Sequence, residues 1–476
     1  MSKITVIDSK PGKGKTSFAI QMMKERYDDK FIYITPFLNE CERIRESCEN
    51  RYFLEPNAKS GKGSKLKHFN ELLKEGKNIA STHALFSNIN QETVDALKQE
   101  NYTLILDETM NILEELKITK KDLNYLFQVN AIKFDENTKK LTWIDDEYDD
   151  LGKFADVKNA CKFGDVYLID NKLCYWLFPV EIFNLFNEVY IMTYMHKGQI
   201  MSYYLDLYNV QYDVKSVQFS HTRGFGNMKE NVYELTDYIK EDNMIYKDLI
   251  NIYEGSLNKI ENKKTDFSKS YYINDKKNNK EKIERLKKNL INYFKNAAKG
   301  KGEDNAWTVF KDFQNLLKGK GYTKGFIEFN IRATNKYKNK KNNKEKIERL
   351  KKNLINYFTN ITKGKGEDNA WTVFKDFQNL LKGRGYTKGF IEFNIRATNK
   401  YKNKKNLAYC CNVYLNPEHK KLFKANGIEV DENYYALDKL IQWLFRSQLR
   451  DNLPINIYIP SSRMRELLIK WIHNEM

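Results

Sequence analysis

The stretch Ile4-Thr-Val-Ile-Asp-Ser-Lys-Pro-Gly-Lys-Gly-Lys-Thr-Ser17 decides the fold of this chain. Its first residues are apolar and β-branched, which predicts a strand, and the apolar residues after it, Phe18, Ile20 and Met22, indicate a helix. A glycine-rich turn between a strand and a helix is the context in which a P-loop binds phosphate. The stretch therefore predicts a nucleoside triphosphate site in an α/β domain. A basic, glycine-rich surface turn is the alternative interpretation.

The turn residues have separate expected roles. Gly12 and Gly14 would let the backbone approach a phosphate, and the N–H groups that open the helix would point at the anion. Lys15 would reach the β- and γ-phosphates, and the Thr16 hydroxyl would hold Mg²⁺. Ser9 stands where the first glycine of such loops is usual. The cofactors predicted are ATP and Mg²⁺, and the predicted binding residues are Gly12, Lys13, Gly14, Lys15, Thr16 and Ser17.

Composition narrows the class of protein. The chain has 476 residues, enough for about two or three domains. Its 81 Lys and Arg against 63 Asp and Glu give a net charge of +18, which favours nucleic acid as a partner, with a Lys/Asn-rich codon bias as the alternative. The 6 cysteines have no C-x-x-C spacing, which disfavours zinc and is typical of reduced cytosolic thiols. No apolar stretch reaches the roughly 18 residues of a membrane span, so we expect no signal peptide, no membrane partner and a cytoplasmic location.

Alternating patterns predict a first α/β domain over residues 1–230. Strands are expected at Ile4–Ile7, Phe31–Ile34, Asn78–Ala80, Leu104–Leu106 and Val189–Met192, with helices between them. This order predicts a parallel sheet with its ligand chemistry at the carboxyl ends of the strands. Two β-hairpins, Lys133–Ile144 and Val166–Phe178, are expected within an insertion at about residues 113–185.

A second α/β domain is predicted over residues 231–476, and it contains a tandem repeat. Residues 278–341 recur as 342–405 with four differences. Solenoid repeats drift more and come in larger numbers, so the pattern indicates a recent duplication, natural or from sequence assembly. Each copy predicts an amphipathic helix and a Trp-Thr-Val-Phe strand. A helix over Ala436–Arg450 and a strand at Ile455–Ile459 are expected after the repeat.

Two further patterns carry chemistry. Asp107 and Glu108 follow a predicted strand, where Asp107 could hold the Mg²⁺ of a bound nucleotide and Glu108 could deprotonate the attacking water. An acidic turn after a buried strand is the alternative. Gln442, Arg446 and Arg450 are spaced by four residues and would share one helix face. Two guanidinium groups there suit a γ-phosphate reached from a second domain, and a solvated basic face is the alternative.

The order of these motifs resembles that of superfamily 2, DEAD-like helicases of tailed bacteriophages. The P-loop is similar to motif I of that family and Asp107-Glu108 to motif II, although Thr109-Met110 replaces the usual ending. Gln442, Arg446 and Arg450 resemble motif VI. Weaker matches concern the motifs that contact nucleic acid or couple it to hydrolysis: Thr35 and Pro36, Thr82, Thr193, and Arg396 and Thr398 in the second copy of the repeat.

The resemblance implies two tandem P-loop helicase-type parallel-sheet domains, with a β-hairpin insertion in the first and the duplicated block in the second. It implies an ATP-dependent helicase or translocase that acts on single-stranded or partly duplex nucleic acid, DNA in preference to RNA, in phage replication or recombination, with replisome proteins as further partners. Glu108, Gln442, Arg446 and Arg450 would be its catalytic residues. Two other hypotheses stay open: the large subunit of a terminase, and a replisome-binding module with a weak ATPase.

Overall fold

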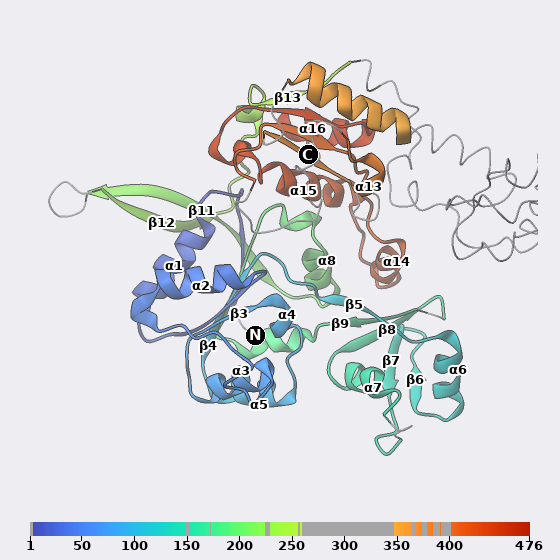
Figure 1. Ribbon diagram of the computed structural model, residues 1–476. Helices are drawn as coiled ribbons and strands as arrows, with labels where there is room; N and C mark the ends of the chain where they lie inside the picture. The colour runs from blue at the N-terminus through green and yellow to red at the C-terminus, as the bar shows by residue number, and fades with distance from the viewer. Residues whose placement is uncertain are drawn as a thin grey trace, which may run out of the picture.

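The computed structural model describes residues 3–148, 152–171, 173–223, 229–255, 258, 347–363, 368–373, 378–383, 391 and 401–476. These residues form three sheets, which Figure 1 shows as separate bodies: a first parallel sheet, an inserted sheet beside it, and a second parallel sheet above it. The first copy of the repeat, residues 278–341, lies outside the described residues. No helix in the described ranges is long and apolar enough to cross a membrane.

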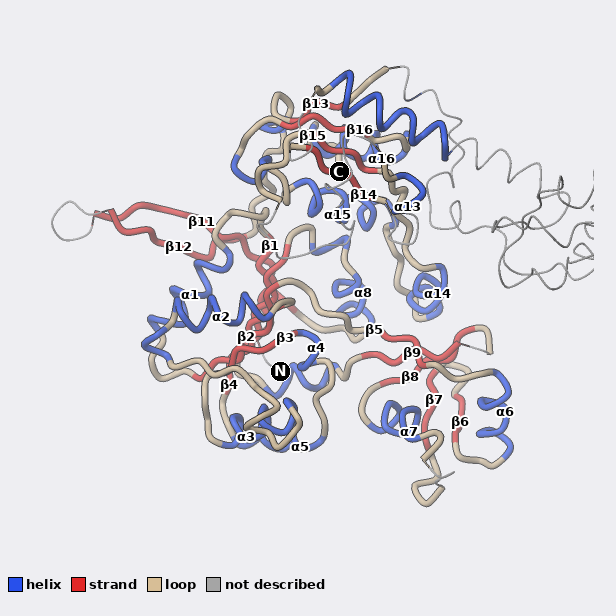
Figure 2. The backbone as a smooth tube through the Cα atoms, in the orientation of Figure 1, coloured by secondary structure: helices blue, strands red, loops and turns tan. Residues whose placement is uncertain are grey.

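The first sheet has seven strands in the order β12-β11-β1-β10-β4-β2-β3. All neighbours pair in parallel except β11 and β12, which form a long antiparallel hairpin that projects from the body (Figure 2). The strands are β1 (Lys3–Asp8), β2 (Lys30–Thr35), β3 (Ile79–Thr82), β4 (Tyr102–Asp107), β10 (Glu188–Thr193), β11 (Tyr212–Arg223) and β12 (Lys229–Asp237).

Helices cover both faces of this sheet, because its strands are apolar on both sides. One face packs against α1 and α2, and the other against α3, α5 and α8. The helices and 3₁₀ turns of this part are α1 (Lys15–Glu25), α2 (Leu38–Ser47), η1 (Glu49–Arg51), α3 (Lys65–Lys74), α4 (His83–Phe86), α5 (Gln91–Gln99), η2 (Val180–Leu185), η3 (His196–Gly198) and α8 (Ile200–Leu207).

The insertion between β4 and β10 is a five-stranded antiparallel sheet in the order β5-β9-β8-β7-β6. Both predicted hairpins are present, as β6–β7 and β8–β9, and β5 adds a strand that the sequence analysis did not predict. Its elements are β5 (Leu113–Leu116), α6 (Lys120–Gln128), β6 (Ile132–Phe134), β7 (Lys140–Trp143), α7 (Ala155–Lys162), β8 (Asp165–Ile169) and β9 (Leu173–Leu177).

The second parallel sheet has four strands in the order β13-β16-β15-β14. Helices α15 and α16 cover one face, and the helical residues 347–361 cover the other with the buried Leu350, Leu354 and Phe358. The elements are η5 (Met244–Tyr246), β13 (Ile250–Ile252), the π-turn η9 (Tyr357–Ile361), β14 (Asn369–Thr372), α13 (Gln378–Leu381), β15 (Asn406–Tyr409), α14 (Pro417–Ala425), α15 (Glu432–Leu444), η11 (Gln448–Asp451), β16 (Ile455–Tyr458) and α16 (Ser462–Ile472).

The predicted fold class is confirmed: two parallel-sheet α/β units follow one another, the first with an inserted antiparallel sheet and the second with the duplicated block. The second copy of the repeat supplies β14, and its Trp371 is fully buried in that strand. The division of the chain into domains at residue 230 stays a prediction. One element differs from expectation, because the helix predicted over Ala436–Arg450 begins at Glu432 and ends at Leu444, and η11 follows it.

Candidate functional site: a P-loop facing a second parallel sheet

The predicted P-loop lies at the carboxyl end of β1, where the chain turns into α1. Gly12 and Gly14 both adopt the left-handed backbone region, with φ of 89° and 91°. A Cβ atom on Gly14 would overlap the ring of Tyr233, which β12 places against the loop. Glycine is therefore required at Gly14 by both backbone angle and space.

Ser9 ties the loop to the sheet on both sides of β1. Its backbone N–H donates to the carbonyl of Thr193 at 3.1 Å, and its Oγ accepts from the backbone N–H of Val217 at 2.9 Å. A glycine could make only the first of these bonds. The departure from the usual glycine therefore adds an anchor to β11, and it leaves the part of the loop from Gly12 to Thr16 unaltered.

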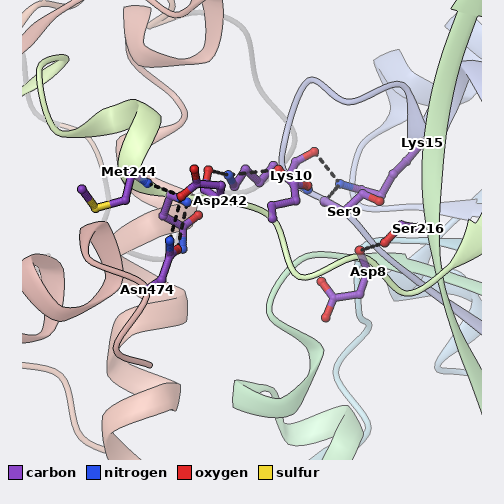
Figure 3. Close-up of polar contacts among 10 residues, drawn as sticks. Asp8, Ser9, Lys10, Lys15, Ser216, Asp242, Met244 and Asn474 are labelled. Atoms are coloured by element: carbon purple, nitrogen blue, oxygen red, sulfur yellow. Dashed lines mark hydrogen bonds and ion pairs between the residues drawn. The ribbon is translucent and has the colours of Figure 1, made fainter.

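Lys15 opens α1 and folds its side chain back under the loop. Its Nζ donates to the carbonyl of Ser9 and, at 3.2 Å, to the carbonyl of Lys10 (Figure 3). Burial lowers the pKa of this ammonium, and the negative charges of Glu108, Asp107 and Asp8 oppose that shift. Next to it, Thr16 and Ser17 are half-buried at the start of α1, and Lys13 is exposed.

Asp107 ends β4 at the same edge of the sheet. In the strand order, β10 lies between β1 and β4, and Met192 pairs with Asp107 while Thr193 pairs with Asp8. The carboxylate is 8% exposed and accepts a hydrogen bond of 2.8 Å from the Tyr33 hydroxyl. Burial, with the charge of Glu108 as a second cause, raises the pKa of Asp107 to about 6. A buried carboxylate held by one neutral donor suits a bound cation.

Glu108 has φ of 65°, a conformation that side-chain-bearing residues rarely adopt. Its backbone N–H donates to the carbonyl of Met192 at 2.9 Å, which holds the turn against β10. Backbone strain of this kind is concentrated at functional sites. Its side chain is 17% exposed and therefore remains accessible at the edge where β4 ends.

The two arginines reach this edge from the part of the chain that follows α15. Arg446 is 4% exposed, and its Nη2 lies 3.9 Å from Oε1 of Glu108. A Cβ on Gly12 would lie 3.5 Å from Cγ of Arg450, so this side chain packs on the P-loop. The prediction that they share one helix face was wrong, because α15 ends before both. Arg446 follows its C-terminus and Arg450 lies in η11.

Gln442 lies on α15, and its hydrogen bond is to another residue of that helix. Its Nε2 donates to Oδ1 of the fully buried Asp438 at 2.5 Å. Asp438 also accepts at 3.3 Å from Nε2 of Gln199, whose Oε1 accepts from the Thr193 hydroxyl at 2.9 Å. These side chains form a buried polar connection between the end of β10 and α15.

The other predicted nucleic-acid residues lie at strand ends of the first sheet. Thr35 is buried at the end of β2, and Pro36 is half-buried after it. The hydroxyl of Thr82 accepts from the backbone N–H of Leu85 at 3.4 Å and caps α4. Arg396 and Thr398 lie outside the described residues. Their roles, like those of all the site residues, stay predictions.

The structure therefore brings together Lys15 at the start of α1, Asp107 and Glu108 at the end of β4, and Arg446 and Arg450 after α15. Sequence reasoning missed Tyr33 and Asp8. Asp8 accepts hydrogen bonds from the backbone N–H groups of Met195 and His196, at 2.8 and 3.1 Å, and burial raises its pKa to about 6. A carboxylate at the very end of β1 was a signal for Asp8, whereas Tyr33 carried none beyond its position in a strand.

Mg²⁺ would need oxygen ligands from the protein and from phosphate or water. In the ranges the structure describes, no group of three or more His, Cys, Asp or Glu side chains could hold a metal ion. The Thr16 hydroxyl and the Asp107 carboxylate are oxygen donors of the kind that Mg²⁺ prefers, and their role as its ligands stays a prediction.

Comparison with solved structures gives weak similarities. The Xpd4 protein of S. tokodaii matches with a TM-score of 0.38 and 12% identity, over 98% of this chain and 94% of that one. The DUF1998 helicase MrfA, in a crystal structure bound to DNA, matches with a TM-score of 0.30 and 8% identity, over 99% of this chain and 46% of that one. Neither similarity assigns a function to this chain.

Sequence comparison is decisive about the family. Residues 113–176 match the YonV middle domain, and residues 244–343 and 338–472 each match the YonV C-terminal Rossmann-like domain. The SPbeta prophage-derived uncharacterized protein YonV of Bacillus subtilis (strain 168) is 35% identical over 489 residues, which cover 100% of both chains. The chain belongs to the YonV family.

Proposed function

We propose that this protein is an ATP-dependent nucleic-acid helicase or translocase. One observation carries the proposal: Arg446 lies 3.9 Å from Glu108 while Arg450 packs on Gly12, so the part of the chain around the second sheet supplies two guanidinium groups to the P-loop edge of the first. Two α/β units that share one phosphate site in this way can convert hydrolysis into a relative movement.

The residues divide the chemistry between them. The loop N–H groups and Lys15 would bind the β- and γ-phosphates, and Thr16 and Asp107 would hold Mg²⁺, which would neutralise the developing charge. Glu108 accepts the proton of the attacking water. Arg446 and Arg450 stabilise the charge of the transferring phosphoryl group. Asp438 fixes the side chain of Gln442 by a hydrogen bond.

The nucleic acid would cross the carboxyl ends of the strands. Pro36 and Thr82 are half-buried at strand ends there, while Thr35 and Thr193 are fully buried and would act without direct contact. The net charge of +18 favours a polyanion. Arg396 and Thr398 would contribute from the second copy of the repeat. We propose DNA in preference to RNA, and a cytoplasmic role in phage replication or recombination with replisome proteins as partners, since the relative is named as prophage-derived.

The test is phosphate release from ATP by the purified protein, measured with no nucleic acid, with single-stranded DNA and with single-stranded RNA. We expect hydrolysis that DNA stimulates and that Lys15→Ala abolishes, because a phosphate contact and its charge are lost. Hydrolysis by the Lys15→Ala variant at the wild-type rate would contradict the P-loop assignment. DNA binding without hydrolysis would favour a binding module, and Mn²⁺-dependent endonuclease activity would favour a terminase.

A further inference from the structure

Lys10, the second residue of the P-loop, points away from the phosphate site and into the C-terminal part of the protein. Its side chain is 1% exposed, and its Nζ lies 3.0 Å from Oε2 of Glu241. The same ammonium lies 4.7 Å from the ring centroid of Tyr246 and 5.8 Å from that of Trp471. It is thus enclosed by one carboxylate and two aromatic rings, surroundings that retain a buried cation.

Glu241 holds Lys10 at two points. Besides the ion pair, its Oε1 accepts from the backbone N–H of Lys10 at 3.2 Å. The carbonyl of Lys10 in turn accepts from the backbone N–H of Lys13 and from Nζ of Lys15, both at 3.2 Å. The Glu241 carboxylate, which lies outside the loop, therefore fixes Lys10, whose carbonyl accepts a hydrogen bond from Lys15.

The segment that carries Glu241 is fastened to the end of α16. Asn474 donates from Nδ2 to Oδ1 of Asp242 at 2.7 Å and accepts at Oδ1 from the backbone N–H of Asn243 at 2.9 Å. Figure 3 shows Asp242 and Asn474 on the left, Lys15 on the right and Lys10 between them. Polar contacts thus run without interruption from Asn474 through residues 241–243 and Lys10 to Lys15.

We propose that Glu241 and Lys10 are positioning residues that couple the seating of α16 to the conformation of the P-loop. When α16 holds residues 241–243 in place, Glu241 keeps the loop in the form that presents Gly12, Gly14 and Lys15 to phosphate. When that hold is released, the loop loses the anchor that Glu241 provides and binds nucleotide less tightly. This inference rests on the proposed nucleotide site. Arg446 and Arg450 are one place where the C-terminal part of the chain reaches that site, and the contact of Glu241 with Lys10 is a second.

The experiment measures two properties of the full chain: the dissociation constant for ADP by calorimetry, and amide hydrogen exchange of residues 9–14 without nucleotide. The variants are Glu241→Ala, Lys10→Met and Asn474→Ala. Glu234→Gln, an exposed acidic residue of β12, and Glu475→Ala, next to Asn474, serve as controls. We expect Glu241→Ala and Asn474→Ala to weaken ADP binding by roughly 2- to 30-fold and to accelerate exchange in the loop, with both controls unchanged.

Lys10→Met separates positioning from packing. It keeps an apolar stem between Tyr246 and Trp471 and leaves Glu241 free to hold the backbone N–H, so we expect a smaller loss of affinity than in Glu241→Ala. In the double variant Glu241→Ala/Lys10→Met, the loss of ADP affinity should be smaller than the sum of the two single losses, because both residues act as one unit. Lowered melting temperatures with wild-type ADP affinity and wild-type exchange at residues 9–14 would overturn the inference. Failure of the wild-type protein to bind ADP or ATP would instead contradict the proposed function.

Discussion

The hydroxyl of Tyr33 in β2 donates a hydrogen bond of 2.8 Å to Oδ2 of Asp107 at the end of β4. Tyr33 is fully buried, and burial with the nearby charge of Asp107 raises its pKa well above the usual value, so it remains a donor throughout the physiological range. The bond fixes the direction of one carboxylate oxygen and leaves the other for the proposed Mg²⁺. A neighbour that orients a ligand in this way contributes to metal affinity.

Tyr33→Phe should therefore raise the Mg²⁺ concentration for half-maximal ATP hydrolysis by about 10-fold. The control is Tyr102→Phe at the opposite end of β4, where the hydroxyl donates to the carbonyl of Lys77 at 2.9 Å. Both variants lose one buried hydrogen bond, but only the first touches the carboxylate. Equal Mg²⁺ dependence in the two variants would mean that Tyr33 has a purely structural role.

Asp107 should make stability depend on pH. Its folded pKa of about 6 lies above the usual 3.8, so the folded state binds more protons than the unfolded state between these values. The contribution of this carboxyl group to the free energy of unfolding is therefore fully present below about pH 4. It is lost as pH rises through about 6, and the loss amounts to about 3 kcal/mol. Asp107→Asn should raise the melting temperature at about pH 7.5 and have no such benefit at about pH 4. The gain is smaller than the full loss, because the introduced NH₂ group needs a buried partner.

Asp122→Asn gives the opposite sign and serves as the comparison. The hydrogen bond from Lys153 lowers the pKa of this carboxyl, so its contribution to stability is present at neutral pH and is lost as pH falls through the lowered pKa. Its replacement should lower the melting temperature slightly at about pH 7.5. The same sign of change in both variants at that pH would contradict the assignment of a raised pKa to Asp107.

Glu108→Gln should keep ATP binding and slow hydrolysis by about 10²- to 10⁴-fold, because only the proton-accepting group is lost. The strained backbone at φ of 65° is retained, so the fold of the turn should not change. Single-turnover hydrolysis and ATP binding by calorimetry measure the two effects separately. Loss of binding with unchanged hydrolysis per bound nucleotide would indicate that Glu108 supports the loop and takes no part in the chemistry.

Arg446→Ala and Arg450→Ala should each lower the rate constant of hydrolysis, on the order of 10³-fold, and weaken ATP binding much less. A guanidinium group that stabilises developing charge acts mainly on the transition state. Lys470→Ala, an exposed basic residue of α16, is the matched loss of one positive charge. Steady-state kinetics should separate the three variants, and normal hydrolysis by both arginine variants would mean that the two guanidinium groups take no part in the chemistry.

Much of this site was predictable because its signals are local. The strand, glycine turn and helix around Gly12 lie within a few residues of one another, and Asp107 follows an apolar run that only a buried strand explains. The spacing of the arginines predicted one shared helix face, and this was wrong because α15 ends at Leu444 and η11 follows it. Contacts such as that of Lys10 with Glu241, 231 residues apart, could not be predicted, because no local pattern in either segment specifies the other.

The duplicated block gives the last prediction. The described part of copy two is integral to the second sheet: β14 pairs with β15 from Asn369–Thr372 to Asn406–Tyr409, and the backbone N–H groups of Lys405 and Asn406 donate to the carbonyl of Asp368. A single copy of the repeat is therefore expected to supply the strand that pairs with β15. Deletion of residues 278–341 joins Lys277 to Asn342 and reproduces the Lys341–Asn342 junction already present. We expect a soluble protein of equal or higher melting temperature with intact DNA-stimulated hydrolysis.

Deletion of residues 342–405 is the matched control, because its product has the same length and differs only at the four positions where the copies differ. In copy two, the hydroxyls of Thr359 and Thr362 donate to the carbonyls of Ile355 and Phe358, at 2.6 and 3.3 Å, around the π-turn, while Ile361 is 42% exposed. Copy one has Lys295, Ala298 and Ala297 at these positions. Loss of Thr359 and Thr362 removes these two hydrogen bonds, but copy one has the same residues at the positions of the buried Leu350, Leu354 and Phe358. Both deletions should therefore fold and hydrolyse ATP. The deletion of residues 342–405 should have the slightly lower melting temperature. If both deletions unfold the protein, each copy has its own place in the fold and the block is not redundant.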